Sequence, residues 1–181
     1  DGVWSSSLAG GRTTTNSLFA GDYTVVIPGV TGSAQIPSGD SYATLHVAAD
    51  GLATMNGTLA DGSQFMQSAY ITEQGDWPMC VSLYAAKGAV VSWIHFADLS
   101  NSDLRGMLVW IKEAGASATS YPNGFINETE AVGSRYAAPT GQGKAINLSA
   151  AAVNFSGGTI ASAFNNAVSV NAGSQVVNLS P

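Results

Sequence analysis

The sequence predicts an all-β fold: an antiparallel meander that closes into a small barrel or sandwich, followed by a second β unit. Short apolar runs alternate with Gly, Asp-Gly, Gly-Asp and Pro at intervals of about ten residues, which is typical of such folds. The runs are rich in Val, Ile, Thr, Tyr, Phe and Trp, which fit a pleated surface. No segment of helix length carries a sustained apolar stripe at helical spacing, so we expect no long helix.

The strands of the first unit are expected where these runs lie, at residues 20–27, 41–48, 52–59, 64–72, 79–85, 89–96 and 105–112. Glycine-containing corners separate several of them: Asp50-Gly51, Asp61-Gly62 and Lys87-Gly88. Asp and Gly tolerate the positive φ angles of tight turns, so these corners predict hairpins between sequential strands. Asp50 and Asp61 are thereby explained as turn residues. Direct hairpins make the sheet antiparallel.

Alternation predicts which side chains fill the core. In the strand at 41–48, one face carries Ala43, Leu45 and Val47, and the other face carries Tyr42, Thr44 and His46. We expect the first set inside and the second set outside. The runs 89–96 and 105–112 are apolar on both faces, so these strands are expected to lie centrally or to meet a second layer. Trp93 and Trp110 lie inside those runs and are predicted to be core residues.

The patterning divides the chain into three parts. Residues 1–17 are rich in Ser, Thr and Gly and are expected to form an arm or linker. Residues 18–113 are expected to form the barrel or sandwich domain, and residues 114–181 the second β unit. The segment 113–142 is expected to be an irregular crossing rich in Gly, Ala, Ser and Pro. Strand patterning then resumes at 143–149, 151–156, 166–171 and 174–180.

The charge content argues against several classes of partner. Only 10% of the residues are charged, against about 25% in typical soluble domains. This composition is typical of extracellular β proteins and assembling surface proteins, so we expect a secreted or cell-surface protein. The six Lys and Arg residues are scattered and the net charge is −6, which disfavours nucleic acid and anionic membranes as partners. No run reaches the ~18 apolar residues of a membrane span, so membrane insertion is not expected. A single cysteine excludes an intramolecular disulfide.

A series of short motifs occurs in order between Gly39 and Lys112: Ser41–Val47, Gly57–Ser63, Trp77-Pro78, Leu83-Tyr84, Lys87-Gly88 and Gly106–Lys112. In this order the motifs resemble a tandem β-strand module of large, secreted or cell-surface, multidomain bacterial proteins. Gly133–Tyr136 and Asn154–Gly158 resemble the next segment of such proteins. The resemblance covers more than half of the chain.

The resemblance implies a β-rich module that is exported to the cell surface or the medium. It implies no catalytic residues, because no established activity belongs to the module. Such modules usually continue with further strands beyond the point that corresponds to Pro181, so the second sheet is expected to be incomplete in this chain. An incomplete sheet leaves unpaired backbone groups at an edge, which can pair with another chain.

Candidate catalytic and metal-binding residues are few. Glu128 and Glu130 would share one face of a strand and could lie within the ~5–9.5 Å that separates glycosidase carboxyl groups, although we favour a solvated loop pair. Asp98 and Asp103 flank a polar loop that could bind calcium, although an ordinary turn also explains them. Two histidines in separate strands lack a third ligand for zinc. No Gly-x-Ser-x-Gly motif occurs and no pattern predicts a cofactor, so the sequence disfavours an enzyme.

Exposed aromatic rings are the stronger functional indication. Sugars present apolar C–H faces that stack on rings, while Asn, Gln and Asp bind their hydroxyl groups. Trp77 lies at the start of a strand beside a loop, Tyr84 lies close to the next turn, and Trp4 lies in the polar arm. These three are the candidate ligand-binding residues. The alternative for Trp77 is that it closes one end of a barrel.

The sequence therefore favours a non-catalytic extracellular binding module. Its expected partner is a polysaccharide or another component of the cell surface or matrix, with carbohydrate as the favoured ligand. Two alternatives stay open. The protein could be a self-assembling structural or fibre subunit joined by β-strand pairing at an open sheet edge. It could also be a carbohydrate-active hydrolase that uses Glu128 and Glu130.

Overall fold

The computed structural model describes residues 10–13, 17–117, 120–141, 143–156 and 160–181, and the chain divides into two compact units, Asp1–Tyr136 and Ala137–Pro181. Both units are built from strands. The helical content of the described residues is one short 3₁₀ turn, η1 (Tyr84–Ala86). No helix within those residues is both long and apolar enough to span a membrane. The all-β prediction is confirmed.

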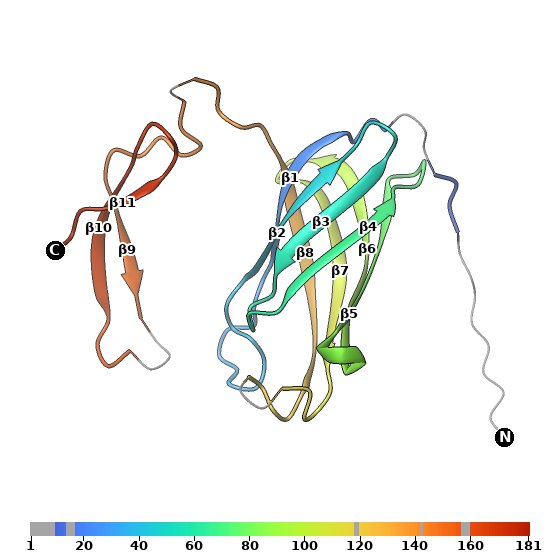
Figure 1. The fold of residues 1–181 in the computed structure, drawn as a ribbon, viewed down its shortest axis with the longest axis horizontal. Coiled ribbons are helices and arrows are strands. Elements are labelled where there is room, and N and C mark those ends of the chain that lie inside the picture. Colours follow the sequence, from blue (N-terminus) through green and yellow to red (C-terminus); the bar gives the residue numbers. More distant parts are fainter. Residues whose placement is uncertain (1–9, 14–16, 118–119, 142, 157–159) are drawn as a thin grey trace. The chain divides into compact units, whose positions relative to one another are not determined.

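The first unit is an eight-stranded antiparallel sheet that curls into a nearly closed barrel (Figure 1). Its strands are β1 (Gly21–Ile27), β2 (Ser41–Val47), β3 (Leu52–Thr58), β4 (Gln64–Tyr70), β5 (Asp76–Leu83), β6 (Gly88–Leu99), β7 (Ser102–Lys112) and β8 (Phe125–Tyr136). They are hydrogen-bonded in the order β4-β3-β2-β1-β8-β7-β6-β5. The glycine-containing corners join neighbouring antiparallel strands, as predicted.

Strand β8 places the boundary between the units later than the sequence suggested. The segment 113–142 was expected to be an irregular crossing that opens the second unit. Instead, Phe125–Tyr136 is a twelve-residue strand that pairs with β7 on one side and β1 on the other. The first unit therefore ends at Tyr136 rather than at residue 113. The strand escaped prediction because its buried positions include the polar Asn127 and the small Ala131 and Gly133, which give no apolar alternation.

The barrel is closed between β4 and β5 by side chains. A short turn connects the end of β4 to the start of β5, and in it the Thr72 N–H donates to the Asp76 carbonyl oxygen at 2.9 Å. Within the described strands no backbone ladder joins the rest of β4 to β5. The Gln67 amide bridges them: Nε2 donates to the Pro78 carbonyl oxygen at 2.7 Å, and Oε1 accepts from the Cys80 N–H at 2.7 Å. One side-chain amide thus replaces one step of a ladder.

Two further features belong to this junction, which we call the β4–β5 seam. The Trp77 Nε1–H donates to the Ala69 carbonyl oxygen at 3.1 Å, so a core indole also ties β5 to β4. Pro78 has no N–H to offer a ladder, and its carbonyl group points to Gln67 across the seam. A proline is tolerated on this side of β5 because it is the side without backbone pairing.

The inner face of the barrel carries the hydrophobic core, in which Trp77 and Trp110 are the largest fully buried side chains. The core position predicted for Trp110 is confirmed. Strand β2 also alternates as predicted, with Ala43, Leu45 and Val47 buried and Tyr42, Thr44 and His46 exposed. The core prediction for Trp93 is wrong: its side chain is 55% exposed. It shares the outer face of β6 with His95, because residues two apart in a strand point the same way.

The second unit is a three-stranded antiparallel sheet of order β11-β10-β9, formed by β9 (Ala151–Phe155), β10 (Phe164–Val170) and β11 (Val176–Asn178). The strand expected at 143–149 does not form among the described residues. Instead, Lys144 Nζ donates to the Val170 carbonyl oxygen of β10, and the Ala145 N–H donates to Ser174 Oγ in the turn after β10. One sheet face is mostly apolar, with Asn166 and Asn178 as its polar positions. Val168 and Val170 on it are buried, whereas Val153, Phe155, Phe164 and Val176 are between 38% and 67% exposed.

We predict that Gln67→Leu lowers the free energy of unfolding by about 1–2 kcal/mol. The change removes the amide nitrogen and the amide oxygen of Gln67 from the seam, and it leaves the Pro78 carbonyl and the Cys80 N–H without these partners. The expected loss is moderate because water can reach these partly exposed backbone groups. Urea unfolding followed by tryptophan fluorescence measures the difference.

Gln64→Leu is the matched control. Gln64 lies in the same strand with an exposed side chain, and surface substitutions of this kind usually change stability by less than ~0.5 kcal/mol. Equal stability of the two variants would show that the Gln67 amide does not hold the seam.

Candidate functional site

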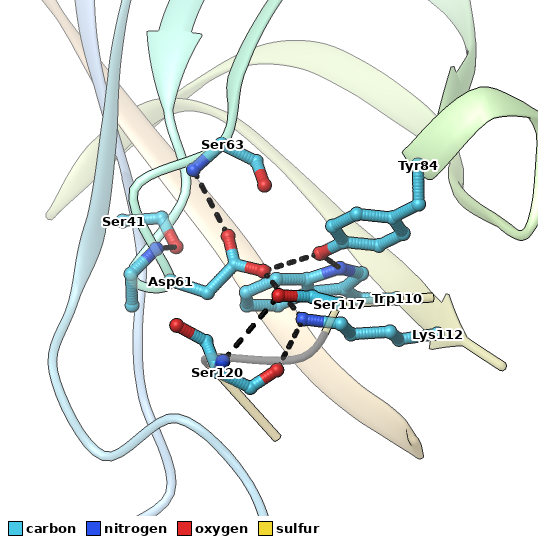
Figure 2. A network of polar contacts seen from close by, with 9 residues as sticks. Ser41, Asp61, Ser63, Tyr84, Trp110, Lys112, Ser117 and Ser120 are labelled. Carbon is cyan, nitrogen blue, oxygen red and sulfur yellow. Dashed lines mark hydrogen bonds and ion pairs between the residues drawn. The ribbon is translucent and has the colours of Figure 1, made fainter. Parts of the chain in front are cut away.

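A buried ion pair closes one end of the barrel. Asp61 Oδ2, from the corner between β3 and β4, lies 3.2 Å from Lys112 Nζ at the end of β7, and both side chains are 1% exposed (Figure 2). Tyr84 Oη donates to the same carboxylate oxygen at 2.6 Å, and Trp110 Nε1 donates to Tyr84 Oη at 3.1 Å. Lys112 Nζ also donates to the Ser120 carbonyl oxygen at 2.7 Å. We call this set the ion-pair network.

The turn after β5 places Tyr84 over this pair. Tyr84, Ala85 and Ala86 have left-handed backbone angles, with φ of 53°, 55° and 69°, which costs roughly 1–2 kcal/mol for each residue that has a Cβ. Gly88 allows the ring to approach, since a Cβ there would lie 2.6 Å from the Tyr84 ring. Lys112 Nζ lies 4.5 Å from the centre of that ring, in cation–π contact. A strained turn is thus retained where it completes a charged network.

Hydrogen bonds decide the charge states in the network. Burial alone would raise the pKa of the Asp61 carboxyl, but hydrogen bonds from Tyr84, Ser63 and Lys112 outweigh it and hold that pKa below its usual value. Burial, followed by the hydrogen bond to Asp61, raises the pKa of the Tyr84 phenol. Asp61 is therefore a carboxylate and Tyr84 a neutral donor. Because both charged side chains are enclosed, we interpret the network as a structural clamp.

Two predicted ligand-binding aromatics do not form an exposed platform. Trp77 is 0% exposed, so the alternative of an interior plug describes it correctly. Its position alternates with those of Pro78 and Cys80, and it shares the inner face of β5 with Met79. Tyr84 is half-buried and its hydroxyl group belongs to the ion-pair network. Trp4 lies outside the described residues.

Glu128 and Glu130 share one face of a strand, but this strand is β8 and not a crossing loop. Both side chains are exposed on the outer surface of the barrel. Their cross-strand neighbours in β7 are the apolar Val109 and Met107. A solvated position on the outside of a sheet offers no enclosure for a scissile bond, so the pair gives no support to the hydrolase alternative.

Asp98 and Asp103 line one groove of about 410 Å³, near the corner between β6 and β7. Arg135 lines the same groove, and its backbone N–H donates to Asp103 Oδ2 at 2.5 Å. Among the described residues, no cluster of three or more His, Cys, Asp or Glu side chains is arranged to hold a metal ion. Two carboxylates beside an arginine fit a hydrogen-bonded corner better than a calcium site.

The exposed tryptophan of β6, Trp93, lines a groove that the sequence pattern did not predict. The groove has a volume of about 320 Å³ and is lined by Gly10, Gly11, Thr72, Gln74, Asp76 and Trp93. This volume lies at the lower end of the ~300–1,000 Å³ that is usual for small-molecule sites. We call it the Trp93 groove.

The N-terminal arm forms one wall of the Trp93 groove. Thr13 pairs with Thr72 in an isolated antiparallel bridge, and the Glu73 N–H donates to the Arg12 carbonyl oxygen at 2.8 Å. Gly11 is needed for this close approach, because a Cβ there would lie 2.5 Å from the Thr72 methyl carbon. The arm is therefore more than a linker over its described residues.

Several hydrogen-bonding groups around the Trp93 ring have no partner among the described residues. Trp77 and Trp110 donate their indole N–H groups within the barrel. In contrast, the Trp93 indole and the Gln74 amide make no hydrogen bond with any described residue. Asp76 Oδ1 lies 2.8 Å from His95 Nδ1, and no described residue contacts its second oxygen through a hydrogen bond. The exposed part of the Trp93 ring can stack on an apolar surface, and the amide and carboxylate groups beside it can bind hydroxyl groups.

The alternation of β6 contains the signal for this site. Trp93 and His95 fall on one face, and Ile94 and Phe96 fall on the other. Val91 and Trp93 obscure this alternation in the sequence, because their apolar side chains on the outer face make the run apolar on both faces. His95, the polar residue of the outer face between Ala89 and Phe96, marks that face as the solvated one.

No family model matches the chain, and no match was found among the curated proteins or the solved structures.

We predict that Lys112→Met lowers the free energy of unfolding by about 3 kcal/mol, because it leaves the Asp61 carboxylate buried without its cation. Urea unfolding at neutral pH measures the loss. Tyr84→Phe, which removes a single hydroxyl group from the network, should cost about 1–2 kcal/mol and tests the same network if Lys112→Met does not fold.

Lys87→Met is the matched control, since Lys87 is an exposed lysine beside the same turn. If Lys112→Met and Lys87→Met unfold at the same denaturant concentration, the ion-pair network does not stabilise the barrel.

Proposed function

We propose that this protein is a non-catalytic extracellular module that binds an uncharged polysaccharide at the Trp93 groove. The observation that supports the proposal is the exposed indole of Trp93, which lies beside unused hydrogen-bonding groups of Gln74 and Asp76. The position of this side chain in a groove, rather than its exposure alone, favours a binding role.

The chemistry of the groove fits a sugar better than an apolar or an acidic ligand. The ring offers a flat apolar face, while the Gln74 amide can donate hydrogen bonds to hydroxyl groups or accept them, and the Asp76 carboxylate can accept them. Asp76 and the net charge of −6 disfavour polyanions. An uncharged glycan offers both apolar faces and hydroxyl groups, and it carries no negative charge.

A location outside the cell is part of the proposal. It depends on the low charge content, which is typical of extracellular β proteins, and on the resemblance to modules of secreted bacterial proteins. A polysaccharide of a cell surface or matrix is the ligand class that such a setting provides.

Self-association through the second unit is a second candidate function. The three-stranded sheet leaves a partly exposed apolar face. Lys144 is the single charged side chain in the sequence from 137 to 181, and neither edge strand, β9 or β11, contains the Lys or Pro that commonly protects sheet edges. A second copy of the same unit is a suitable partner because the face carries no charge that would repel it.

We predict that Trp93→Ala weakens the binding of soluble uncharged polysaccharides at least about tenfold, since buried tryptophan contacts often contribute about 2 kcal/mol or more to binding. Affinity gel electrophoresis with hydroxyethylcellulose, galactomannan and xyloglucan measures the change. The fold should be retained because the side chain is largely exposed.

Tyr136→Ala is the control, because Tyr136 is an exposed aromatic residue of β8 that does not line the Trp93 groove. Retardation of Trp93→Ala equal to that of the unmodified protein, or no retardation of the unmodified protein by any of these polymers, would contradict the proposal.

For the second candidate, we predict reversible self-association that Val153→Lys abolishes. The substitution introduces a charge into the apolar face of β9, where the present side chain is already partly exposed. Sedimentation velocity over a hundredfold range of concentration measures it. A monomer at every concentration would exclude assembly through this face.

A further inference from the structure

A second surface of the barrel has the same combination of aromatic, amide and hydroxyl groups. It is an open depression of about 500 Å³ over β2, β3 and β4, lined by the outward residues Tyr42, Thr44, Asn56, Thr58, Gln64 and Met66 together with Gly57 and the buried Phe65. Tyr42 and Met66 are 63% and 69% exposed. We call this the Tyr42 shelf.

The strand register arranges the shelf in two rows. Tyr42, Thr58 and Gln64 are cross-strand neighbours in one row, and Thr44, Asn56 and Met66 are neighbours in the next. Three strands at the usual spacing make each row about 10 Å wide. Each row therefore places one large side chain beside an amide and a hydroxyl group, on a rigid sheet.

The polar groups of the shelf are available to a ligand. The side chains of Asn56 and Gln64 and the Tyr42 hydroxyl group make no hydrogen bond with any described residue. Other polar side chains on the same strands are used internally. Thr54 Oγ1 lies 2.8 Å from Ser68 Oγ, and Gln67 uses both the nitrogen and the oxygen of its amide at the β4–β5 seam. The unused groups are thus concentrated on the shelf.

The shelf and the Trp93 groove lie on opposite sides of the β4–β5 seam. The centre of the shelf is β3 and the exposed tryptophan is on β6, three strand positions apart in the closed order. Outer faces of a barrel diverge around its axis, so the two surfaces point in different directions. A short oligosaccharide cannot occupy both, whereas two separate chains can.

We propose that the Tyr42 shelf is a second binding site for uncharged glycan, so that one barrel crosslinks two polysaccharide chains. The shelf contains no carboxylate, amine or imidazole group, which makes a neutral, hydroxyl-rich ligand its best match. The crosslinking role rests on the function proposed for the Trp93 groove, but the shelf as a site does not. Two linked sites also raise the apparent affinity for a polymer that offers many copies of the ligand.

Isothermal titration with cellohexaose, mannohexaose and a xyloglucan oligosaccharide tests the second site. We expect two ligands per chain for the unmodified protein and one for each of the variants Tyr42→Ala and Trp93→Ala. Tyr136→Ala should retain two. Both substituted side chains are largely exposed, so thermal unfolding should remain close to that of the unmodified protein.

Light scattering with the corresponding polymers tests crosslinking. Mixtures with the unmodified protein should form clusters well above the scattering of protein or polymer alone, and both single-site variants should bind without forming clusters. Val153→Lys serves as a background in which clusters cannot arise through the second unit.

The possible failures are distinguishable. If Trp93→Ala binds no ligand and Tyr42→Ala is unchanged, the shelf is not a site, while the proposed function stands. If Tyr42→Ala binds no ligand and Trp93→Ala is unchanged, the Trp93 groove fails and the shelf remains. Clusters that persist with both variants, or the absence of binding by the unmodified protein, overturn the crosslinking proposal.

Discussion

The β4–β5 seam is the constraint on which the rest of the barrel depends. Eight antiparallel strands leave two edges, and an open edge exposes backbone groups that can pair with other chains. Here the edges meet without a ladder, and side chains make the connection in series. Trp77 reaches Ala69, the Gln67 amide spans to β5, and Tyr84 reaches Asp61 where the strands lie farthest from their shared hairpin. The closure is specific because each contact needs one particular side chain. It also determines how the two outer surfaces beside the seam are oriented.

The ion-pair network is the last of these connections and the one with the largest desolvation cost. Desolvating a carboxylate and an ammonium group costs several kcal/mol each, and a buried pair often adds little net stability. Its contribution here is better understood as specificity. Asp61 comes from the corner before β4, Tyr84 from the turn after β5 and Lys112 from the end of β7, so one network joins three separate parts of the sheet. The left-handed turn at Tyr84 is tolerated because it carries the ring over the pair.

Local patterns were sufficient to predict most strands, the hairpin corners and the faces of β2, because turn chemistry and alternation are properties of adjacent residues. They were insufficient wherever a strand's role depends on distant partners. Strand β8 has small and polar inner residues, which only the neighbouring β1 and β7 explain. Asp61 was correctly placed at a turn, but its pairing with Lys112 joins residues far apart in the chain. Trp93 was assigned to the core although its side chain is exposed, because the apolar neighbours of Trp93 weighed more than alternation, and for Trp77 the residues alone left both an exposed and an interior position open.

The filled interior explains why the proposed binding sites are on the outside of this barrel. In small barrels the inward side chains pack the lumen, and here Trp77 and Trp110 occupy it with their indole N–H groups already used. The two proposed sites are therefore on the outside of the barrel: the Tyr42 shelf is made of strand residues, and the Trp93 groove combines strand residues with the N-terminal arm and the turn before β5. Positions on strands are fixed in spacing and direction by the register, so neighbouring outward residues act as a set. Such a surface suits a ligand with a repeating structure, since a repeating ligand can match a regular row of side chains without being enclosed.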